Sequence, residues 1–236
     1  MERSGLSGQY PQTALTDIGM MKAIVFDMDG VLFDTERLCR DCWVGHAEKY
    51  GISDMAEVFP LCIGRNRTDT ETILQERYGE KFPALQFCRE ASEVFWKEIE
   101  EKGHPIKAGV SEILEFLSGA GWTIGLASST GRESVLKHLE KTGLRQYFSV
   151  VIGGDQVLHS KPEPDIYLLA CRELGADPQD TYAVEDSYHG IRSAYRAGMM
   201  PVMIPDLLPE TEEMKKMCIG IFPDLLRFRD FLGKNE

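Results

Sequence analysis

Short apolar runs alternate with helical repeats along most of this 236-residue chain. Runs rich in β-branched residues predict buried strands at residues 22–26, 123–127, 149–152, 181–184 and 201–204. Apolar residues with helical spacing lie between these runs, at residues 110–117, 132–142, 164–174 and 191–197. Such alternation is typical of a parallel sheet that is covered by helices on both faces. We therefore predict an α/β fold.

The alternation is interrupted after the first strand. Helical patterns occupy residues 35–50, 68–78 and 84–102, and we find no convincing strand before residue 105. A run of helices after one strand of a parallel sheet predicts a small helical domain inserted into a larger one. We predict a three-layer Rossmann-like core from residues 21–34 and 104–236, with the helical domain at 35–103. Residues 1–20, rich in Gly, Ser, Thr and Gln, are expected to form a loosely ordered extension.

Composition limits the classes of partner. The 38 acidic and 26 basic residues give a net charge of -12, and an acidic surface repels nucleic acid and anionic lipid. No apolar run approaches the roughly 20 residues that cross a bilayer. No secretion signal accompanies the six cysteines, so we expect a cytoplasmic protein with reduced thiols. We expect no nucleic-acid or membrane binding, and we favour a monomer.

Polar side chains follow four of the predicted strands. In chain order they are Asp27 and Asp29, then Ser128, Ser129 and Thr130, then Lys161, and last Glu185 and Asp186. Ligands of parallel sheets bind beyond the carboxyl ends of the strands, so these side chains are expected to share one edge. Converging carboxylates repel one another unless a cation lies among them. Oxygen ligands without nearby Cys or His favour Mg²⁺.

The remaining groups at this edge favour phosphate chemistry. Residues 128–130 precede a predicted helix, whose first amides can bind an anion, and Lys161 adds a positive charge. Together with Mg²⁺ these groups predict a phosphoryl-transfer site. The sequence Asp27–Gly30 also resembles the start of a calcium loop, but such loops lie between helices, whereas a strand precedes Asp27. Cys39 and Cys42 form a C-x-x-C pair without the second pair that a zinc site needs.

The four motifs resemble, in order, those of the haloacid dehalogenase superfamily. They are Phe26–Gly30, Leu126–Ser129, Lys161–Pro162 and Val184–Ser187. The likeness extends from residue 22 to about residue 205, and the order and spacing of the motifs make it specific. The helical insertion lies where that superfamily has its small cap domain. The chain is most similar to the branch of β-phosphoglucomutase-like proteins and phosphosugar phosphatases, which implies an α/β core with an inserted α-helical cap domain.

The resemblance also implies a role for each matching residue. Asp27 is the expected nucleophile, which forms an aspartyl-phosphate, and Asp29 is the expected acid and base. The phosphoryl oxygens are expected to be held by Ser128, Ser129 and Lys161. The expected metal site comprises Asp27, the carbonyl of Asp29, Asp186 and Glu185, the last as a ligand or as a partner of one. In the cap, Arg67 matches an arginine that binds a distal phosphate or another polar group of the substrate.

Two departures from the branch bear on the reaction. Cys39 stands where β-phosphoglucomutase has a histidine that couples cap closure to acid–base catalysis, and Gly131 stands where it has a lysine. We therefore expect a Mg²⁺-dependent phosphatase acting on a small phosphorylated metabolite, in particular a sugar phosphate. A sugar phosphomutase is the alternative, and a non-catalytic phosphate-binding module is a third interpretation. Asp29 argues against carbon–halogen cleavage, because the dehalogenases of the superfamily lack this second aspartate.

Overall fold

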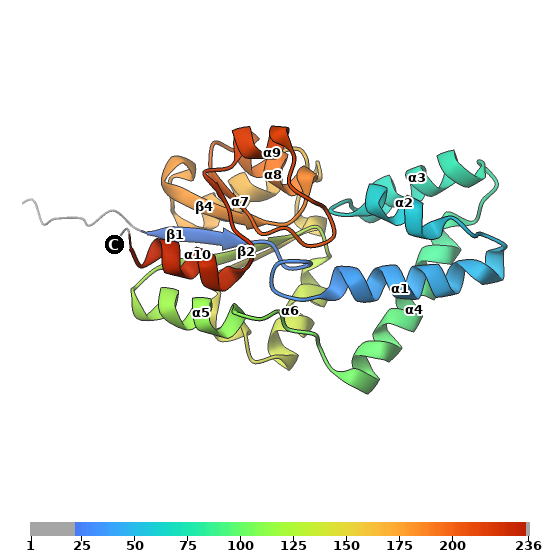
Figure 1. Cartoon of the computed structure of the whole chain (residues 1–236), viewed down its shortest axis with the longest axis horizontal. Coiled ribbons are helices and arrows are strands. Elements are labelled where there is room, and N and C mark those ends of the chain that lie inside the picture. Colours follow the sequence, from blue (N-terminus) through green and yellow to red (C-terminus); the bar gives the residue numbers. More distant parts are fainter. Residues whose placement is uncertain (1–21, 235–236) are drawn as a thin grey trace, which may run out of the picture.

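A parallel sheet forms the centre of the larger domain. A computed structural model of the chain describes residues 22–234, so the predicted extension 1–20 lies outside the described residues. The described part contains a six-stranded sheet with the order β3-β2-β1-β4-β5-β6 (Figure 1). Its strands are β1 (Ala23–Phe26), β2 (Thr123–Ser128), β3 (Val150–Gly153), β4 (Thr181–Glu185), β5 (Met200–Met203) and β6 (Gly220–Ile221). The central strand β1 pairs with β2 and β4, so the carboxyl ends of these three strands are neighbours.

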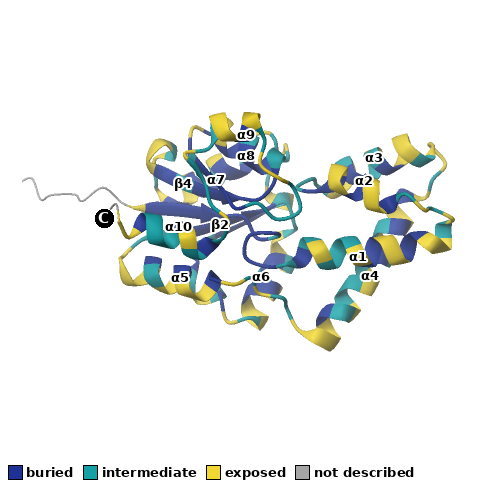
Figure 2. Cartoon of the chain, viewed as in Figure 1, coloured by how far each residue is buried: buried dark blue, intermediate teal, exposed yellow. Residues whose placement is uncertain are grey.

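Helices cover both faces of the sheet. They are α5 (Val110–Gly119), α6 (Arg132–Lys141), α7 (Asp165–Leu174), α8 (Tyr188–Arg196), α9 (Glu212–Met217) and α10 (Leu225–Leu232). Ile24 and Phe26 of β1 pack in one apolar cluster with α5, α6 and α10, whereas Val25 packs in another with α7 and α8. Successive strand residues point to opposite faces, so the two clusters define three layers. The strands are buried between them (Figure 2), which confirms the predicted α/β architecture.

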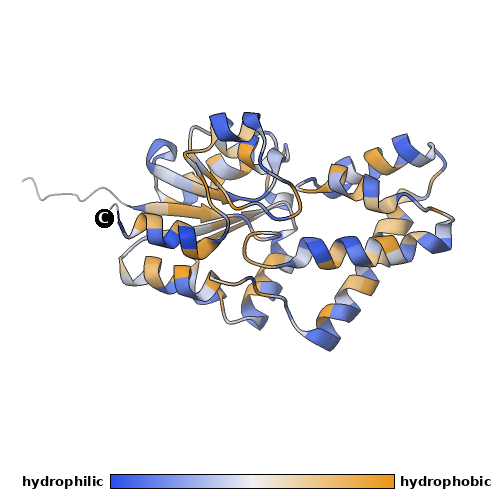
Figure 3. Cartoon of the chain, in the orientation of Figure 1, coloured by the Kyte–Doolittle hydropathy of each residue, from blue (hydrophilic) through white to orange (hydrophobic). Residues whose placement is uncertain are grey.

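The inserted segment is helical and has an apolar cluster of its own. Its helices are α1 (Thr35–Ala47), α2 (Met55–Cys62), α3 (Arg67–Tyr78) and α4 (Ala84–Lys102). Buried residues of all four helices meet in this cluster, where Trp43 contacts Phe59 and Phe87 edge-on with ring centroids 5.4 Å apart. Hydrophilic and hydrophobic residues alternate along α1 and α4 in Figure 3, as expected for helices with one buried face. None of the helices within residues 22–234 combines the length and hydrophobicity needed to cross a membrane.

Several elements differ from the sequence-based expectation for physical reasons. The first cap helix ends at Ala47 and continues as a 3-10 turn to Tyr50, instead of running as one helix over 35–50. Helix α2 is not predicted because it contains Pro60, which is disfavoured inside a helix. Strand β6 has two residues, too few for a periodic pattern, and it forms only through pairing with β5. The short helices α9 and α10 are likewise not predicted from periodicity.

Two chain segments connect the core and the cap, and they run side by side. The Asp34 amide donates to the Pro105 carbonyl (2.8 Å), and the Lys107 amide donates to the Leu32 carbonyl (2.9 Å). Within the outgoing segment, the Gly30 amide donates to the Phe33 carbonyl (2.8 Å). The loop that follows β1 therefore forms part of the connection to the cap.

A histidine pair fixes the returning segment to the core. His104 and His138 of α6 lie with their Nδ1 atoms 2.8 Å apart, so one ring must donate and the other must accept. Trp96 of α4 packs on the His138 ring with centroids 4.8 Å apart. Burial lowers the pKa of both rings, to about 4 for His138. The pair is therefore neutral at physiological pH.

We expect the free energy of unfolding to fall by about 2 kcal/mol through His138 as the pH is lowered from about 6.5 to about 4.5. The unfolded ring binds a proton near pH 6.5, whereas the native ring stays neutral until about pH 4, so the contribution is present above this window and is lost within it. Urea denaturation at several pH values measures the slope. His138→Gln should flatten the profile, and His159→Gln, at an exposed position, should not. Equal slopes for all three proteins would contradict this assignment.

Candidate active site

The carboxyl ends of β1, β2 and β4 border a cavity of about 710 Å³ between the core and the cap. Every predicted site residue except Glu185 lines it: Asp27, Asp29, Ser128, Ser129, Lys161 and Asp186 from the core, and Arg67 from α3. Glu185 is fully buried, with 0% of its surface exposed. The topology thus brings together residues that are up to 159 positions apart in the chain, from Asp27 to Asp186.

Lys161 lies between two carboxylates. Its ammonium donates to Asp27 Oδ1 and to Glu185 Oε1, both at 2.6 Å, and to the Ala127 carbonyl at 3.1 Å. Burial alone would lower the pKa of Lys161, but the charges of Asp27 and Glu185 hold its pKa above the ordinary value. All three donors of the ammonium are used, so the amine is a fixed positive charge beside Asp27.

Both carboxylate oxygens of Glu185 accept hydrogen bonds, and one of them contacts Lys161. Its Oε1 also accepts a hydrogen bond from the Tyr167 hydroxyl (2.7 Å), and its Oε2 accepts one from the Ser187 hydroxyl (3.2 Å). A Cβ at Gly190 would lie 1.9 Å from the Glu185 carboxyl group, so only glycine leaves room for it. The role of Tyr167 could not be predicted, because a tyrosine among the apolar residues of a helix is typical of a core position. Its hydroxyl supports Lys161 indirectly.

Asp186 carries a carboxyl oxygen that no group of the described residues satisfies. Within residues 22–234, Oδ2 of Asp186 is buried without a hydrogen-bond partner. Burial, followed by the charge of Glu185, raises its pKa well above the ordinary range, and burial likewise raises the pKa of Asp27. A Cβ at Gly30, whose φ is +79°, would lie 2.1 Å from the same oxygen. Gly30 therefore lets the Asp186 carboxyl group lie close to the backbone of the loop after β1, with one of its oxygens unsatisfied.

These observations fit a divalent cation. Asp27, Glu185 and Asp186 each offer a carboxylate oxygen, and the three oxygens lie within 4.8 Å of one another. A buried carboxylate without a partner is costly, and a hard cation removes both the cost and the mutual repulsion. Both oxygens of Glu185 are already engaged by protein donors, whereas Asp186 Oδ2 is not. Asp27 and Asp186 are thus the side chains best placed to hold the ion.

Three hydroxyl groups surround Asp29. Oδ1 accepts a hydrogen bond from the Thr35 hydroxyl (2.6 Å), and Oδ2 accepts bonds from the hydroxyls of Thr130 (3.0 Å) and Ser128 (3.4 Å). Sequence reasoning noted Thr130 only as part of an anion site and missed Thr35. The available signal was that a threonine closely follows each of the first two motifs. Because Thr35 is the first residue of α1, the cap takes part in orienting Asp29.

Hydrogen bonds also join the cap to the rim of the cavity. The Ser129 hydroxyl donates to the Gly64 carbonyl (3.2 Å), and the Ser160 hydroxyl donates to Asp69 of α3 (3.1 Å). Gly64 has a φ of +73°, and a Cβ there would lie 2.8 Å from the Ser187 hydroxyl oxygen. The cap is therefore in contact with the core at the rim of the cavity. Phosphate binding by the Ser129 side chain stays a prediction, since its hydroxyl contacts the cap.

The chain matches the family model of haloacid dehalogenase-like hydrolases over residues 24–204. The chain belongs to this family. The matched range contains all of β1 but Ala23, strands β2 to β5, the whole helical insertion and every residue of the cavity described above. Members of the family use a divalent metal ion, in agreement with the buried carboxylates of this hydrolase.

Relatives of this haloacid dehalogenase-like hydrolase include a phosphorylated carbohydrates phosphatase from Thermotoga maritima, 35% identical over 76% of this chain and 82% of the relative. Among solved structures, CbbY from Rhodobacter sphaeroides in complex with phosphate is 27% identical, with a TM-score of 0.72, and covers 87% of this chain and 95% of that one. The β-phosphoglucomutase of Clostridium difficile has the same fold, with a TM-score of 0.77 at 22% identity, covering 91% and 96% of the two chains.

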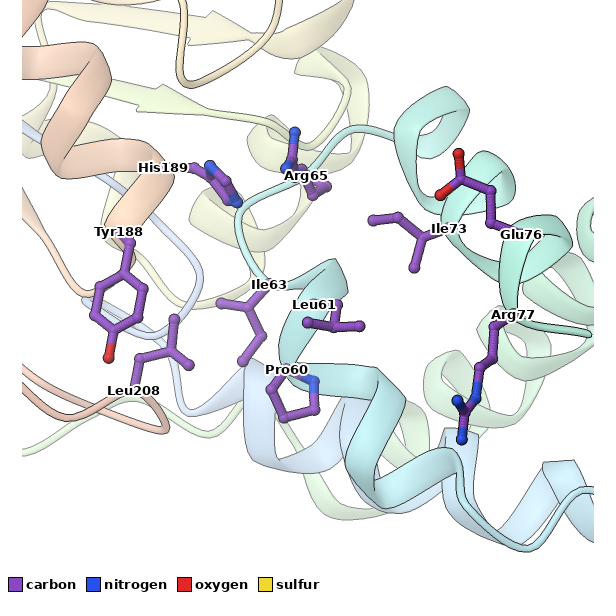
Figure 4. Close-up of a pocket in the computed structure, with 10 residues that line it drawn as sticks. All are labelled: Pro60, Leu61, Ile63, Arg65, Ile73, Glu76, Arg77, Tyr188, His189 and Leu208. Atoms are coloured by element: carbon purple, nitrogen blue, oxygen red, sulfur yellow. The ribbon is translucent and has the colours of Figure 1, made fainter.

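A second cavity of this hydrolase lies away from the carboxylates. It has a volume of about 660 Å³ and lies between α2 and α3 of the cap and α8 of the core (Figure 4). Its walls are mostly apolar, with Pro60, Leu61 and Ile63 on the cap side and Tyr188 and Leu208 on the core side. It contains none of the predicted catalytic residues. The predicted site residues that line a cavity therefore line the first one.

Proposed function

We propose that this chain is a Mg²⁺-dependent phosphatase that hydrolyses small sugar phosphates through an aspartyl-phosphate at Asp27. The observation that supports it best is the contact between Lys161 and Asp27 at 2.6 Å, beside a carboxyl oxygen of Asp186 that lacks a partner among the described residues. A nucleophilic carboxylate, a fixed ammonium and a cation site at one point are what phosphoryl transfer requires.

The proposed reaction has two steps. Lys161 holds Oδ1 of Asp27, which leaves Oδ2 to attack phosphorus. The P–O bond to the leaving group breaks, and the leaving oxygen takes a proton from Asp29, which Thr35 and Thr130 orient. Asp29 then accepts a proton from water, the water oxygen bonds to phosphorus, and the bond between phosphorus and Asp27 breaks.

Other groups of the chain hold the phosphoryl oxygens and exclude water. Ser128 is proposed to bind these oxygens, and the ammonium of Lys161, fixed beside Asp27, is proposed to offset their negative charge. Mg²⁺, which Asp27, Asp186 and the carbonyl of Asp29 would hold, would neutralise their charge further. Glu185 is proposed to position Lys161, since both of its oxygens are engaged. The cap lies over the cavity and is proposed to limit the access of bulk solvent to it. Large or polymeric phosphate esters are therefore expected to be poor substrates.

The proposed substrate class is supported by a residue of the cap and by the names of relatives. Arg67, in the first turn of α3, is exposed at the cavity wall and is proposed to bind a polar or anionic group of the leaving group. The Thermotoga maritima relative is named for activity on phosphorylated carbohydrates. Release of inorganic phosphate from a panel of phosphorylated metabolites, with and without Mg²⁺, tests the proposal. No release from any compound at any divalent metal would refute it.

A sugar phosphomutase remains the second candidate because the fold is also that of a β-phosphoglucomutase. The reactions differ only in whether water or a sugar hydroxyl receives the phosphoryl group. Cys39 lines the cavity, and its thiol, whose pKa burial raises well above the ordinary value, cannot supply the proton chemistry of a histidine. Incubation with β-glucose 1-phosphate separates the two: free phosphate supports the phosphatase, and glucose 6-phosphate supports the mutase.

Mg²⁺ is expected to raise the free energy of unfolding by roughly 2 to 3 kcal/mol at a hundredfold excess over its Kd. The ion satisfies the unpartnered oxygen of Asp186, and Asp186→Asn should therefore lose most of this stabilisation. Scanning calorimetry at increasing Mg²⁺ concentration measures the shift. Asp180→Asn, an exposed position, serves as the matched control and should keep it. An undiminished shift in Asp186→Asn would contradict the proposed ligand set.

A further inference from the structure

Glu36 is an acidic side chain of the cavity that the proposed mechanism leaves without a role. It is the second residue of α1 and follows Thr35, whose hydroxyl donates to Asp29. Its side chain lines the cavity together with Asp29 and Arg67. Within the described part of the chain, Glu36 has no hydrogen-bond or ion-pair partner. It is partly buried, so an ionised group there is only poorly solvated.

The pKa of Glu36 responds to the catalytic aspartates, and its charge affects thiols of the cap. Burial, followed by the charges of Asp29 and Asp27, raises the pKa of Glu36 well above the ordinary range. The charge of Glu36 in turn raises the pKa of the Cys39 and Cys62 thiols, after burial. The carboxyl group is therefore close both to the aspartates that act on phosphorus and to the wall that meets the leaving group.

Two cationic side chains near the start of α1 have other partners. Lys107 contacts Asp206 (3.0 Å) and donates to the Gly30 carbonyl (2.6 Å). Arg37 contacts Asp206 (3.1 Å) and Asp34 (3.2 Å). Glu36 is thus left without a protein donor, and a ligand that enters the cavity has to supply one.

The cap wall around Glu36 offers few other strong acceptors. It includes Trp43 and Phe59 and the thiols of Cys39, Cys62 and Cys88. Burial raises the pKa of all three thiols, so they are neutral and line the cavity as small apolar groups. A leaving group with several hydroxyls needs acceptors when it is desolvated, and Glu36 is the carboxyl group that α1 places on this wall.

We propose that Glu36 determines specificity by accepting hydrogen bonds from hydroxyl groups of a polyhydroxylated leaving group. This inference rests on the proposed phosphatase function and assigns the residue that distinguishes a sugar from a leaving group without hydroxyls. The phosphoryl group occupies the core side of the cavity, at Asp27 and Lys161, and the leaving oxygen lies at Asp29. The rest of the sugar then lies in the cavity that Glu36 lines, where this carboxyl group has no partner among the described residues.

The test compares two substrates in three variants. Sugar phosphates, including glucose 6-phosphate, provide the hydroxyls, and cyclohexylmethyl phosphate provides a ring of similar size without them. In Glu36→Ala we expect kcat/KM for the best sugar phosphate to fall about 10- to 100-fold, because its hydroxyls lose their acceptor. The value for cyclohexylmethyl phosphate should stay within about threefold of wild type. Glu36→Gln, which keeps a neutral acceptor of the same shape, should retain part of the preference. Glu57→Ala, on an exposed cap position, should match wild type for both.

Several results would overturn the proposal. If Glu36→Ala lowered kcat/KM equally for both substrates, or shifted the pH profile alike for both, Glu36 would be a positioning residue for Asp29. If kcat/KM were unchanged for both substrates, Glu36 would have no role in specificity. Glu36→Gln provides the same comparison if Glu36→Ala does not fold. A wild-type preference for cyclohexylmethyl phosphate, or for 2-aminoethyl phosphate, over every sugar phosphate would also contradict it. If wild type releases phosphate from none of these compounds, the phosphatase function itself is refuted.

Discussion

Asp27→Asn is expected to lower the rate of phosphate release by roughly 10⁴- to 10⁶-fold, the loss typical of a missing nucleophile. The amide cannot form the bond to phosphorus that the carboxylate forms. Stability should not fall with activity, because Asp27 is a buried carboxyl group whose pKa is raised by burial. A neutral amide removes that desolvation cost, and Lys161 keeps its contact with Glu185.

Single-turnover phosphate release and thermal unfolding of the same sample separate the two effects. Asp41→Asn, at an exposed position of α1, is the matched control and should leave both unchanged. Burst or steady-state release by Asp27→Asn at a rate close to that of wild type would exclude the covalent mechanism. Loss of activity accompanied by unfolding would show instead that Asp27 is needed for the stability of the protein.

Lys161→Met is expected to lower the free energy of unfolding by about 3 to 5 kcal/mol near neutral pH, as well as to abolish activity. Lys161 is 2% exposed and is the partner of two buried carboxylates, and its removal leaves both charges uncompensated. The loss should shrink as the pH falls. Carboxyl groups with raised native pKa values take up protons in the folded state first, and the protonated groups no longer need the ammonium.

Urea denaturation at pH 8 and at pH 5 measures this difference. Lys97→Met, 76% exposed in its side chain on α4, should change stability by less than about 0.5 kcal/mol. The double variant Lys161→Met/Glu185→Gln should recover part of the loss, because one of the two unpaired charges is gone. A change within about 1 kcal/mol of wild type for Lys161→Met at pH 8 would contradict the buried ion network.

The sheet and most of its chemistry could be predicted because they depend on local patterns. Strands such as Ala23–Phe26 are continuous apolar runs, and the polar residues that follow them are adjacent in sequence, so strand ends locate Asp27 and Asp186 together. The parallel order then brings Lys161 to the same edge without any further information. The helix that contains Pro60 could not be predicted, since tertiary packing in the cap overrides its local preference.

Residues whose roles depend on side-chain direction were not predictable. Tyr167 has the same sequence environment as a core residue, and only the fold turns its hydroxyl to Glu185. Thr35 and Glu36 are neighbours at the start of one helix, yet one donates to Asp29 and the other faces an open cavity. Likewise, only the three-dimensional contacts show that Glu185 pairs with Lys161, whereas Asp186 has an unsatisfied oxygen.

The continuity between the loop after β1 and the connection to the cap has a consequence for the timing of catalysis. Asp29 belongs to that loop, and Thr35, which holds its carboxyl group at 2.6 Å, is the first residue of the cap. Any swing of the cap away from the core would loosen this contact before a product could leave. The enzyme would then carry an aligned proton donor only while a substrate is enclosed, and a phosphorylated Asp27 would be protected from idle hydrolysis whenever the cap stands open.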